Sequence, residues 1–528
     1  MGEKKSLFRG MEGHGTIMRK HHILTAVVAA AVFSLGASTL ALAGEESTYG
    51  GTFTYARSDS TTSFDLHQEI TENNAFAIDK VFESLVTFDN DGNIIDWLAE
   101  DHKISDDGLV YTFTLRDGLK FSDGTDVTAE DVKFSIERHL EVGGSLPIEA
   151  DVKSVEAVDE KTVEITLGTA YTPFLSELAN FSNGIIPKDF GGKTEEEFFK
   201  NPVGTGPFAV SEWDPSGDLT FVKNEYYWQE GKPYIDELVY KVVDDDNQAL
   251  NQLLAGEIDG IEDLSLSNAS NVDGNADTKT ATSFSYNVEE LFFNTLDEHF
   301  SDEHVRRALA MAIDRESLTK ALTFGYAEIA NTVLPRALLY QTNDTVNALS
   351  YDIDAAKEEL AQSAYPDGFD TTISIASGNN TRLQEAQIIQ AAGAQIGINI
   401  EINAQEISTF RSDFRDLNFS MMINSATADY PDANSIFAFQ VDPDGWSKCY
   451  WTSYNNETAA DLMRKGQVTP DGDERAAVYE ELQQILADEV PYIPLYNSEN
   501  VVGLRDNVEG FTVLPNGSVH FEDVYFEE

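Results

Sequence analysis

Short stretches of alternating hydrophobic and polar residues run through the first part of this chain, interleaved with stretches of helical period. In residues 111–115 (YTFTL), large apolar side chains alternate with threonines, as in a strand with one buried face. Thr128 and Asp131 then have the spacing of a capping box, and apolar residues recur every four positions from Val132. The pattern predicts a strand over 111–115 and a helix that begins behind Thr128.

The same kind of pattern predicts the elements of the remaining chain. The segment from Met421 is an apolar strand that runs into small residues. Strands that alternate with helices indicate an α/β fold class, and no internal repeat is visible. Further strands are predicted at 51–56 and 238–243, and helices at 75–88 (entering a strand), 247–255, 306–322, 354–364 and 382–393.

The charge of the chain is strongly unbalanced. It carries 92 acidic and 35 basic residues, which gives a formal net charge of −57 at pH 7. A field of this sign repels nucleic acid and anionic membrane surfaces, so neither is expected as a partner. Two interpretations stay open: a solvated acidic surface that keeps an exported protein soluble, and an attraction for cationic solutes.

The first 43 residues have the composition of a secretory signal peptide. A basic segment, Arg19–His22, precedes the apolar stretch 23–40, and Ala41-Leu42-Ala43 has the small residues of a cleavage site. We therefore expect Sec-type export, cleavage after Ala43 and a periplasmic protein. No cysteine stands near residue 44, so a lipid anchor is not expected; a retained membrane anchor is the alternative, and the cleavage site argues against it.

Several long strings resemble one known family. Residues 111–140, YTFTLRDGLKFSDGTDVTAEDVKFSIERHL, resemble a signature of the family 5 extracellular solute-binding proteins, the oligopeptide, dipeptide and nickel receptors of ABC importers. The resemblance is long and ordered, and it covers the chain behind the signal peptide. Further strings that are similar to family segments are 201–208 (NPVGTGPF), 224–233 (NEYYWQEGKP), 305–315 (VRRALAMAIDR), 396–402 (IGINIEI) and 491–496 (PYIPLY).

The resemblance implies a fold and a function. It implies a two-lobed clamshell of the type II periplasmic-binding-protein class, with lobe I at 44–290, an inserted subdomain at about 87–199, lobe II at 291–499 and a tail, 500–528, that returns to lobe I. It implies a monomeric receptor that captures a short peptide between the lobes and delivers it to an ABC transporter permease. Neither a cofactor nor a metal ion is expected.

A peptide receptor must neutralise the ligand's terminal ammonium and satisfy its backbone polar groups. Ala426 and Thr427 are small residues near the end of the predicted strand, where nothing bulky blocks backbone pairing. Ala428-Asp429-Tyr430 is similar to the family segment that carries the ammonium-binding aspartate, which implies that role for Asp429, with Tyr430 beside it. The alternative is that Asp429 only caps the turn at Pro431.

Two further segments are candidates for the ligand site. The resemblance implies that Thr61, Thr62, Ser63 and Phe64, which follow the first strand, form the opposite wall; an ordinary polar loop is the alternative. The aromatic residues Trp446 and Trp451 follow Asp429 closely and are predicted to line side-chain pockets, because flat aromatic faces accept varied side chains. The alternative for these two tryptophans is a place in the core.

One expected residue is missing. Dipeptide receptors of the family place an arginine for the ligand carboxylate a few residues before the helix that begins near Arg382, where this chain has Ser377-Gly378-Asn379-Asn380. A bidentate arginine clamp at that point is therefore not expected. This departure favours longer peptides, or ligands without a carboxylate, over dipeptides.

No reactive constellation points to an enzyme. The chain has no G-x-S-x-G, H-E-x-x-H or G-x-x-x-x-G-K-[ST] motif, and Cys449 is its only cysteine, so a Cys-based metal cluster is excluded. We therefore expect a binding protein without catalysis. Three alternatives stay open: the same fold with a nickel chelate or an oligosaccharide as ligand, a sensory protein that serves a membrane receptor, and an enzyme or chaperone on the same clamshell.

Overall fold

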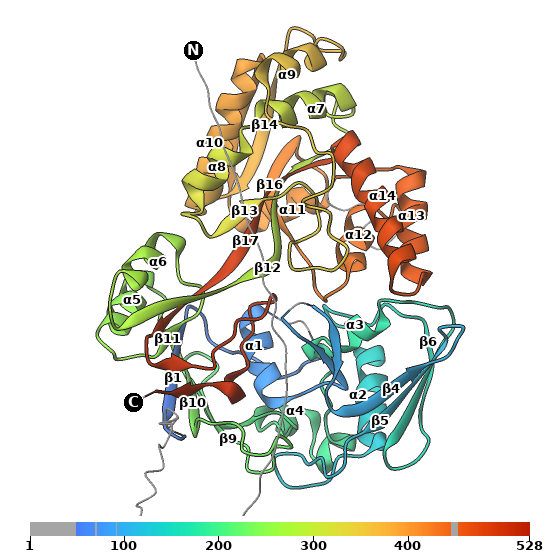
Figure 1. Ribbon diagram of the computed structural model, residues 1–528, viewed down its shortest axis with the longest axis vertical. Helices are drawn as coiled ribbons and strands as arrows, with labels where there is room; N and C mark the ends of the chain where they lie inside the picture. The colour runs from blue at the N-terminus through green and yellow to red at the C-terminus, as the bar shows by residue number, and fades with distance from the viewer. Residues whose placement is uncertain (1–48, 69–70, 91, 445–451, 528) are drawn as a thin grey trace, which may run out of the picture. The chain divides into compact units, whose positions relative to one another are not determined.

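The computed structural model describes residues 49–68, 71–90, 92–444 and 452–527. Its largest sheet has eleven strands in the order β15-β14-β16-β12-β17-β11-β1-β10-β9-β8, with β13 paired to β17 (Figure 1). The bounds of these strands are β1 Thr52–Arg57, β8 Phe208–Trp213, β9 Leu219–Lys223, β10 Glu237–Val242, β11 Gly260–Ile261, β12 Thr278–Phe293, β13 Ala327–Ile329, β14 Phe369–Ala376, β15 Ile398–Gln405, β16 Met421–Thr427 and β17 Tyr492–Arg505.

Two long strands, β12 and β17, run through the middle of this sheet and connect two groups of elements (Figure 1). We call the group with β1–β11 and α1–α6 the first lobe, and the group with β13–β16 and α7–α14 the second lobe. β12 and β17 pair antiparallel, and the register shifts between Phe284 and Val288 of β12. Such an irregularity bends a strand and increases its twist, so the sheet changes direction at this point.

The first lobe combines the β8–β11 side of the large sheet with a separate four-stranded sheet, β4-β5-β7-β6. In β5 (Val110–Leu115) every second side chain is buried, which confirms the predicted strand. The helix α2 begins behind Thr128, whose backbone N–H donates to the Asp131 carboxylate over 2.8 Å, as the capping box predicts. Other elements of this lobe are α1 Glu72–Val81, β2 Val86–Phe88, β3 Ile94–Asp96, β4 Ala99–Ile104, α2 Ala129–Val142, β6 Val152–Ala157, β7 Thr162–Leu167, α3 Phe174–Leu178, α4 Glu195–Lys200, α5 Asp246–Leu254 and α6 Leu266–Asp273.

In the second lobe, the predicted helix over 306–322 is two helices, so this prediction was wrong in one detail. α7 ends at Ala312, Ile313 is extended, and Asp314 starts α8 by accepting a hydrogen bond from the Ser317 N–H over 3.0 Å. An aspartate in this position competes with the helical bonds and favours a new N-terminus. The helices are α7 Glu303–Ala312, α8 Arg315–Leu322, α9 Ile353–Leu360, α10 Asn380–Gln395, α11 Ile407–Arg415, α12 Ala433–Gln440, α13 Glu457–Val468 and α14 Asp473–Glu489.

The last segment of the chain returns to the first lobe. The Phe521 ring packs on the Phe53 ring of β1 with 5.4 Å between centroids, and Lys80 of α1 donates to the Val519 carbonyl over 2.6 Å. Within the described residues, no helix has the length and apolar character needed to cross a membrane. The predicted lobe boundaries at 290 and 499 fall inside β12 and β17, and they stay a prediction.

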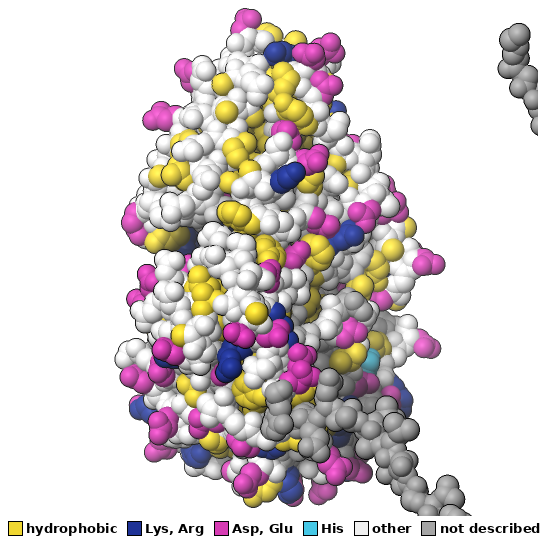
Figure 2. Space-filling model, turned by 60° about the vertical axis from the view of Figure 1, so that its left-hand side comes forward, with side chains coloured by type: hydrophobic (Ala, Val, Ile, Leu, Met, Phe, Trp, Pro, Cys, Tyr) yellow, Lys and Arg dark blue, Asp and Glu magenta, His cyan; other side chains and the backbone are white. Residues whose placement is uncertain are grey.

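Acidic side chains are spread over the face drawn in Figure 2 and do not gather in one patch. They lie on both lobes, between scattered apolar side chains. This distribution suits a solvated acidic surface, the first of the two interpretations of the charge. The second interpretation depends on the charges of the cavity between the lobes.

Candidate functional site

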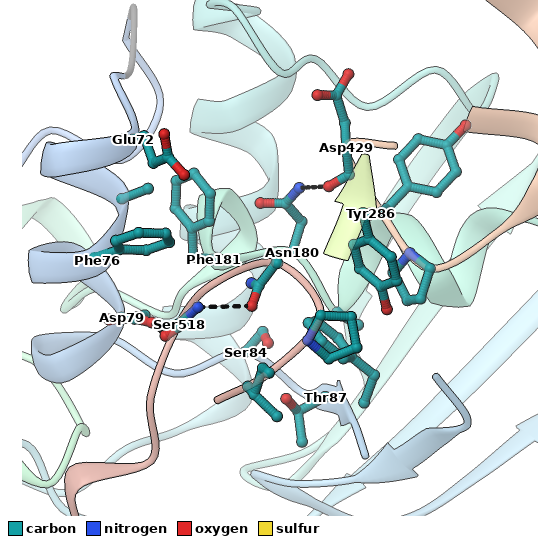
Figure 3. A pocket seen from close by; sticks show the side chains of 18 of the residues that line it. Glu72, Phe76, Asp79, Ser84, Thr87, Asn180, Phe181, Tyr286, Asp429 and Ser518 are labelled. Atoms are coloured by element: carbon teal, nitrogen blue, oxygen red, sulfur yellow. Dashed lines mark hydrogen bonds between the residues drawn. The ribbon is translucent and has the colours of Figure 1, made fainter. Parts of the chain in front are cut away.

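A cavity of about 560 Å³ lies where the two lobes meet. Its walls come from α1 and the segment 179–181 of the first lobe, the bend of β12, the end of β16 with the following residues to Pro431, and the C-terminal segment 514–522. Figure 3 shows Glu72, Phe76 and Asp79 of α1 on one side and Tyr286 of β12 on another. Residues that are far apart in the sequence therefore line one cavity.

Asp429 is held in this cavity by its backbone. Its N–H donates to the Ser435 hydroxyl over 2.8 Å, and its carbonyl accepts a hydrogen bond from the Asn180 side chain over 2.8 Å (Figure 3). Ser435 belongs to α12 of the second lobe, whereas Asn180 follows α3 of the first lobe. The Asn180–Asp429 bond therefore joins the two lobes directly at the site.

The loop that carries Asp429 is fixed by a buried ion pair. Arg475 of α14 makes two parallel bonds of 2.7 and 2.9 Å to the Asp432 carboxylate, and only 0% and 5% of these two residues is exposed. Asp432 also accepts from the Asn434 N–H over 2.8 Å and so starts α12. A bidentate pair of this kind defines the loop geometry closely.

The Asp429 side chain is exposed to the space of the cavity, although protein atoms surround the site. Burial raises the pKa of Asp429 to about 6, and the nearby negative charge of Glu149 adds to the rise. Among the described residues, no basic side chain offsets this effect. Because the carboxylate is exposed to the cavity, a ligand can reach it. Because its pKa is raised, a ligand cation would lower the free-energy cost of ionising Asp429.

The two basic groups in the lining are already engaged. Lys80 lies 3.0 Å from the Asp79 carboxylate and also donates to Ser518 over 3.1 Å. The His520 ring nitrogen Nδ1 lies 2.7 Å from Glu522, and the charge of that glutamate contributes to a raised His520 pKa. The lining described by the structure contains no arginine.

Further carboxylates make the cavity acidic. Burial raises the pKa of Glu83 to about 7, although its carboxylate accepts hydrogen bonds from Trp97 Nε1 over 2.7 Å and from the Tyr227 hydroxyl over 3.1 Å. Burial likewise raises the pKa of Glu72 on α1. The cavity therefore favours a neutral or cationic solute over an anionic one.

The structure places part of the predicted site together. Thr427, Asp429 and Tyr430 line the cavity, whereas Ala426, between the lining residues Ser425 and Thr427, is not in the lining and has 3% of its surface exposed. β16 pairs with β12 over its whole length, but with β14 only at Met421 and its neighbour. The later residues of β16 therefore have a backbone side that is not paired with β14.

The segment Thr61–Phe64 lies against the start of α1, and its residues are not among those that line the cavity. The Thr62 N–H donates to the Asn74 side chain over 2.8 Å, the Thr61 carbonyl accepts from Trp213, and Phe64 is fully buried. Their ligand role stays a prediction. Trp446 and Trp451 lie outside the described residues.

Arg382 forms an ion pair within the protein. Its guanidinium makes bonds of 2.6 and 3.1 Å to the Glu289 carboxylate of β12 and one of 3.3 Å to Ser425. Arg382 is not part of the cavity lining, whereas Ser425 is. Its positive charge is therefore neutralised within the protein.

The pattern of the sequence did not indicate several lining residues. Asn180 and Phe181, the α1 residues and the segment 514–520 carry no local signal of a site. Lys80 and Ser518, which are bonded in the cavity wall, are 438 positions apart in the chain.

The fold and the cavity together define a class: a two-lobed solute-binding protein with its site between the lobes. The family model of the bacterial extracellular solute-binding proteins, family 5 Middle, matches residues 93–448. The chain therefore belongs to the family 5 extracellular solute-binding proteins. The predictions of the family, the two-lobed fold and a solute-binding function are confirmed.

Three relatives show how far the similarity extends. Glutathione-binding protein GsiB of Escherichia coli O1:K1 / APEC is 28% identical over 452 residues, which cover 84% of this chain and 88% of that protein. The structure of HbpA2 from Haemophilus parasuis is similar with a TM-score of 0.82, at 26% identity over 90% of this chain and 100% of that chain. The ABC transporter-associated periplasmic binding protein DppA from Helicobacter pylori, in complex with peptide STSA, has a TM-score of 0.76, at 28% identity over 91% of this chain and 99% of that chain.

Proposed function

We propose that this protein is a receptor for short peptides with a free terminal ammonium, and that it delivers them to an ABC transporter permease. The observation that carries the proposal is Asp429, a carboxylate in the lining of the cavity that has no basic partner among the described residues. An ammonium group at this point would offset the burial of the charge. A relative with a bound peptide and one named for glutathione, itself a peptide, support this class of ligand.

The peptide backbone has a second place to bind. The open side of β16 near Ser425 and Thr427 offers main-chain groups to an extended chain, and Tyr430 lies beside Asp429. A volume of about 560 Å³ is within the range of about 300–1,000 Å³ that is usual for small-molecule sites. We keep Trp446 and Trp451 as candidates for the side-chain pockets, and Thr61–Phe64 as candidates for the opposite wall.

The charge of the cavity narrows the class of possible ligands further. Glutathione has two carboxylates and one ammonium, so it needs cations that the described lining does not offer free. Lys80 and His520 are paired with Asp79 and Glu522. We therefore expect neutral or cationic peptides as ligands.

The remaining features of the proposal concern location and chemistry. The protein is exported with a signal peptide that is cleaved after Ala43, is not lipid-anchored, and acts as a monomer without catalysis. Among the described residues, no group of three or more potential ligands could hold a metal ion. Solute capture by closure of the two lobes needs no chemical step.

Thermal-shift measurements of residues 44–528 test the proposal with di-, tri- and tetrapeptides, each with a free and an acetylated N-terminus. A ligand that binds only the native state stabilises it by about 2.7 kcal/mol at a hundredfold excess over Kd. We expect a rise of Tm with free peptides and none with acetylated ones. No shift with any peptide, but one with a nickel chelate or an oligosaccharide, would replace the proposal by that alternative.

A further inference from the structure

A second, smaller cavity of about 40 Å³ adjoins the first at Asp429. Glu149, Glu177 and Asp429 line it together with the side chain of Asn180. No basic residue is part of the lining that the structure describes. In Figure 3 the Asp429 carboxylate points away from Ser84 and Thr87, which lie in another part of the large cavity. We call this space the side pocket.

Glu177 of α3 is the unusual member of the side pocket. Only 3% of the residue is exposed, and its oxygen Oε1 has no hydrogen-bond partner in the described structure. The other oxygen, Oε2, accepts one long bond of 3.4 Å from the Ala150 N–H. A buried carboxyl oxygen without a hydrogen-bond partner costs free energy, so a ligand that donates a hydrogen bond to this atom would be stabilised.

The side pocket is assembled from both lobes. Tyr171 of the first lobe donates from its hydroxyl to Glu149 over 3.1 Å, and its oxygen lies 3.3 Å from the Tyr430 hydroxyl. Asn434 of the second lobe donates to the Tyr171 hydroxyl over 3.0 Å. The bond to Glu149 stays within the first lobe, whereas the contacts of Tyr171 with Tyr430 and Asn434 exist only while the lobes are in contact, so a ligand bound there favours the closed form.

We propose that the side pocket is a cation subsite, which receives the side-chain ammonium of the first residue of the ligand. The inference rests on the proposed function, because it takes the α-ammonium to lie at Asp429. A primary ammonium has three donors, and the side pocket offers acceptors on Glu149, Glu177 and Asp429. The cavity of about 40 Å³ is small, so a compact ammonium suits it better than a larger planar guanidinium.

Burial raises the pKa of Glu177 well above its ordinary value, and the negative charge of Glu149 adds to the rise. A bound ammonium would favour the ionised form and supply the missing partner of Oε1. Lysine or ornithine at the first position of a peptide provides such a group on a flexible stem. The inferred ligand class is a peptide that carries two ammonium groups at its N-terminal end.

Calorimetric titration with three peptides tests the subsite: Lys-Ala-Ala, norleucine-Ala-Ala and Ala-Ala-Lys. The native protein is expected to bind Lys-Ala-Ala at least about tenfold more tightly than each of the other two, as one charge-assisted hydrogen bond predicts. In Glu177→Gln, the ratio of the Kd values for the norleucine and lysine peptides is expected to fall to about threefold or less. The matched control Glu160→Gln removes an exposed charge of the same lobe and should keep the ratio.

Equal affinities of the lysine and norleucine peptides in the native protein would overturn the subsite and leave the peptide receptor standing. A ratio that persists in Glu177→Gln would overturn it as well. If no peptide binds, the proposed function itself fails, and 1,5-diaminopentane then tests the pocket alone. Binding of this diamine that Glu177→Gln abolishes would support the subsite, and lack of binding would overturn it. The melting temperature of Glu177→Gln reports whether the variant is folded.

Discussion

Replacement of Asp429 by asparagine is the most direct test of the site. The change keeps the size of the side chain and one acceptor oxygen, but it removes the charge. At pH 8 the carboxyl group, with its pKa raised to about 6, is ionised in nearly all molecules. The variant therefore separates the charge of Asp429 from its shape.

The expected loss follows from the surroundings of the carboxylate. A hydrogen bond to a charged group contributes about 1.5–3 kcal/mol. The amide oxygen of the Asp429→Asn variant would still accept one bond, and Glu149 would still attract the ligand cation, so the lower part of this range applies. A loss of about 2 kcal/mol corresponds to an affinity that is roughly 30-fold weaker.

Isothermal titration at pH 8 with a free tripeptide and its acetylated form measures this loss. We expect Asp429→Asn to weaken the binding of the free peptide, so that only a small difference in affinity remains between the free and the acetylated peptide. Asp367→Asn, which removes an exposed charge elsewhere in the second lobe, is the control for net charge. Equal affinity of Asp429→Asn and the parent for the free peptide would refute the assigned role.

Three other predictions follow from the same geometry. Ligand affinity should fall by about tenfold as the pH drops from 8 to 5, because protonation of Asp429, with its pKa of about 6, removes the attraction for the ammonium; a flat titration profile from pH 8 to 5 would contradict this. Asn180→Ala should weaken peptide binding by about 1 kcal/mol, because the bond that joins the lobes at Asp429 is lost; unchanged calorimetric affinity would count against a role in closure. Arg475→Met should lower the free energy of unfolding by about 3–5 kcal/mol, since the Asp432 charge stays buried without its partner, and Asp432→Leu in the same chain should restore part of it. Urea unfolding of both variants measures this, and a loss below about 1 kcal/mol would show that the pair is not needed.

The elements of the fold that could be predicted from the sequence are those with strong local signals. The strand at 111–115 and the capping box at Thr128 depend on neighbours within a few residues, so a pattern is sufficient. The break at Asp314 shows the limit, because helical apolar spacing continues through a residue that starts a new helix. β12 was not predicted as a continuous strand, and its register shift occurs near the cavity, at Phe284 and Val288.

The candidate site was only partly predictable for a related reason. Asp429 was predicted as a ligand residue because a family segment matches its neighbours; the structure places it in the lining of the cavity, and its role stays a prediction. Its partner Asn180 lies 249 positions away, and Glu177 became noticeable only through an oxygen without a hydrogen bond. Contacts of this kind are made by the folded chain, so a local sequence pattern contains no trace of them.

If the chain is exported as proposed, the position of β17 between β11 and β12 has a consequence for the order of folding. A chain that crosses a membrane from its N-terminus delivers the first lobe early, but the strand that completes the sheet of that lobe arrives near the end. The Phe53 ring of β1 can pack on the Phe521 ring only after the last residues have emerged. The pairing of β13 with β17, by contrast, is complete once Ser498 has paired with Ala327. The lobe that is synthesised first is therefore expected to complete its fold last. During translocation its unpaired strand edges would be the part of the chain most exposed to aggregation.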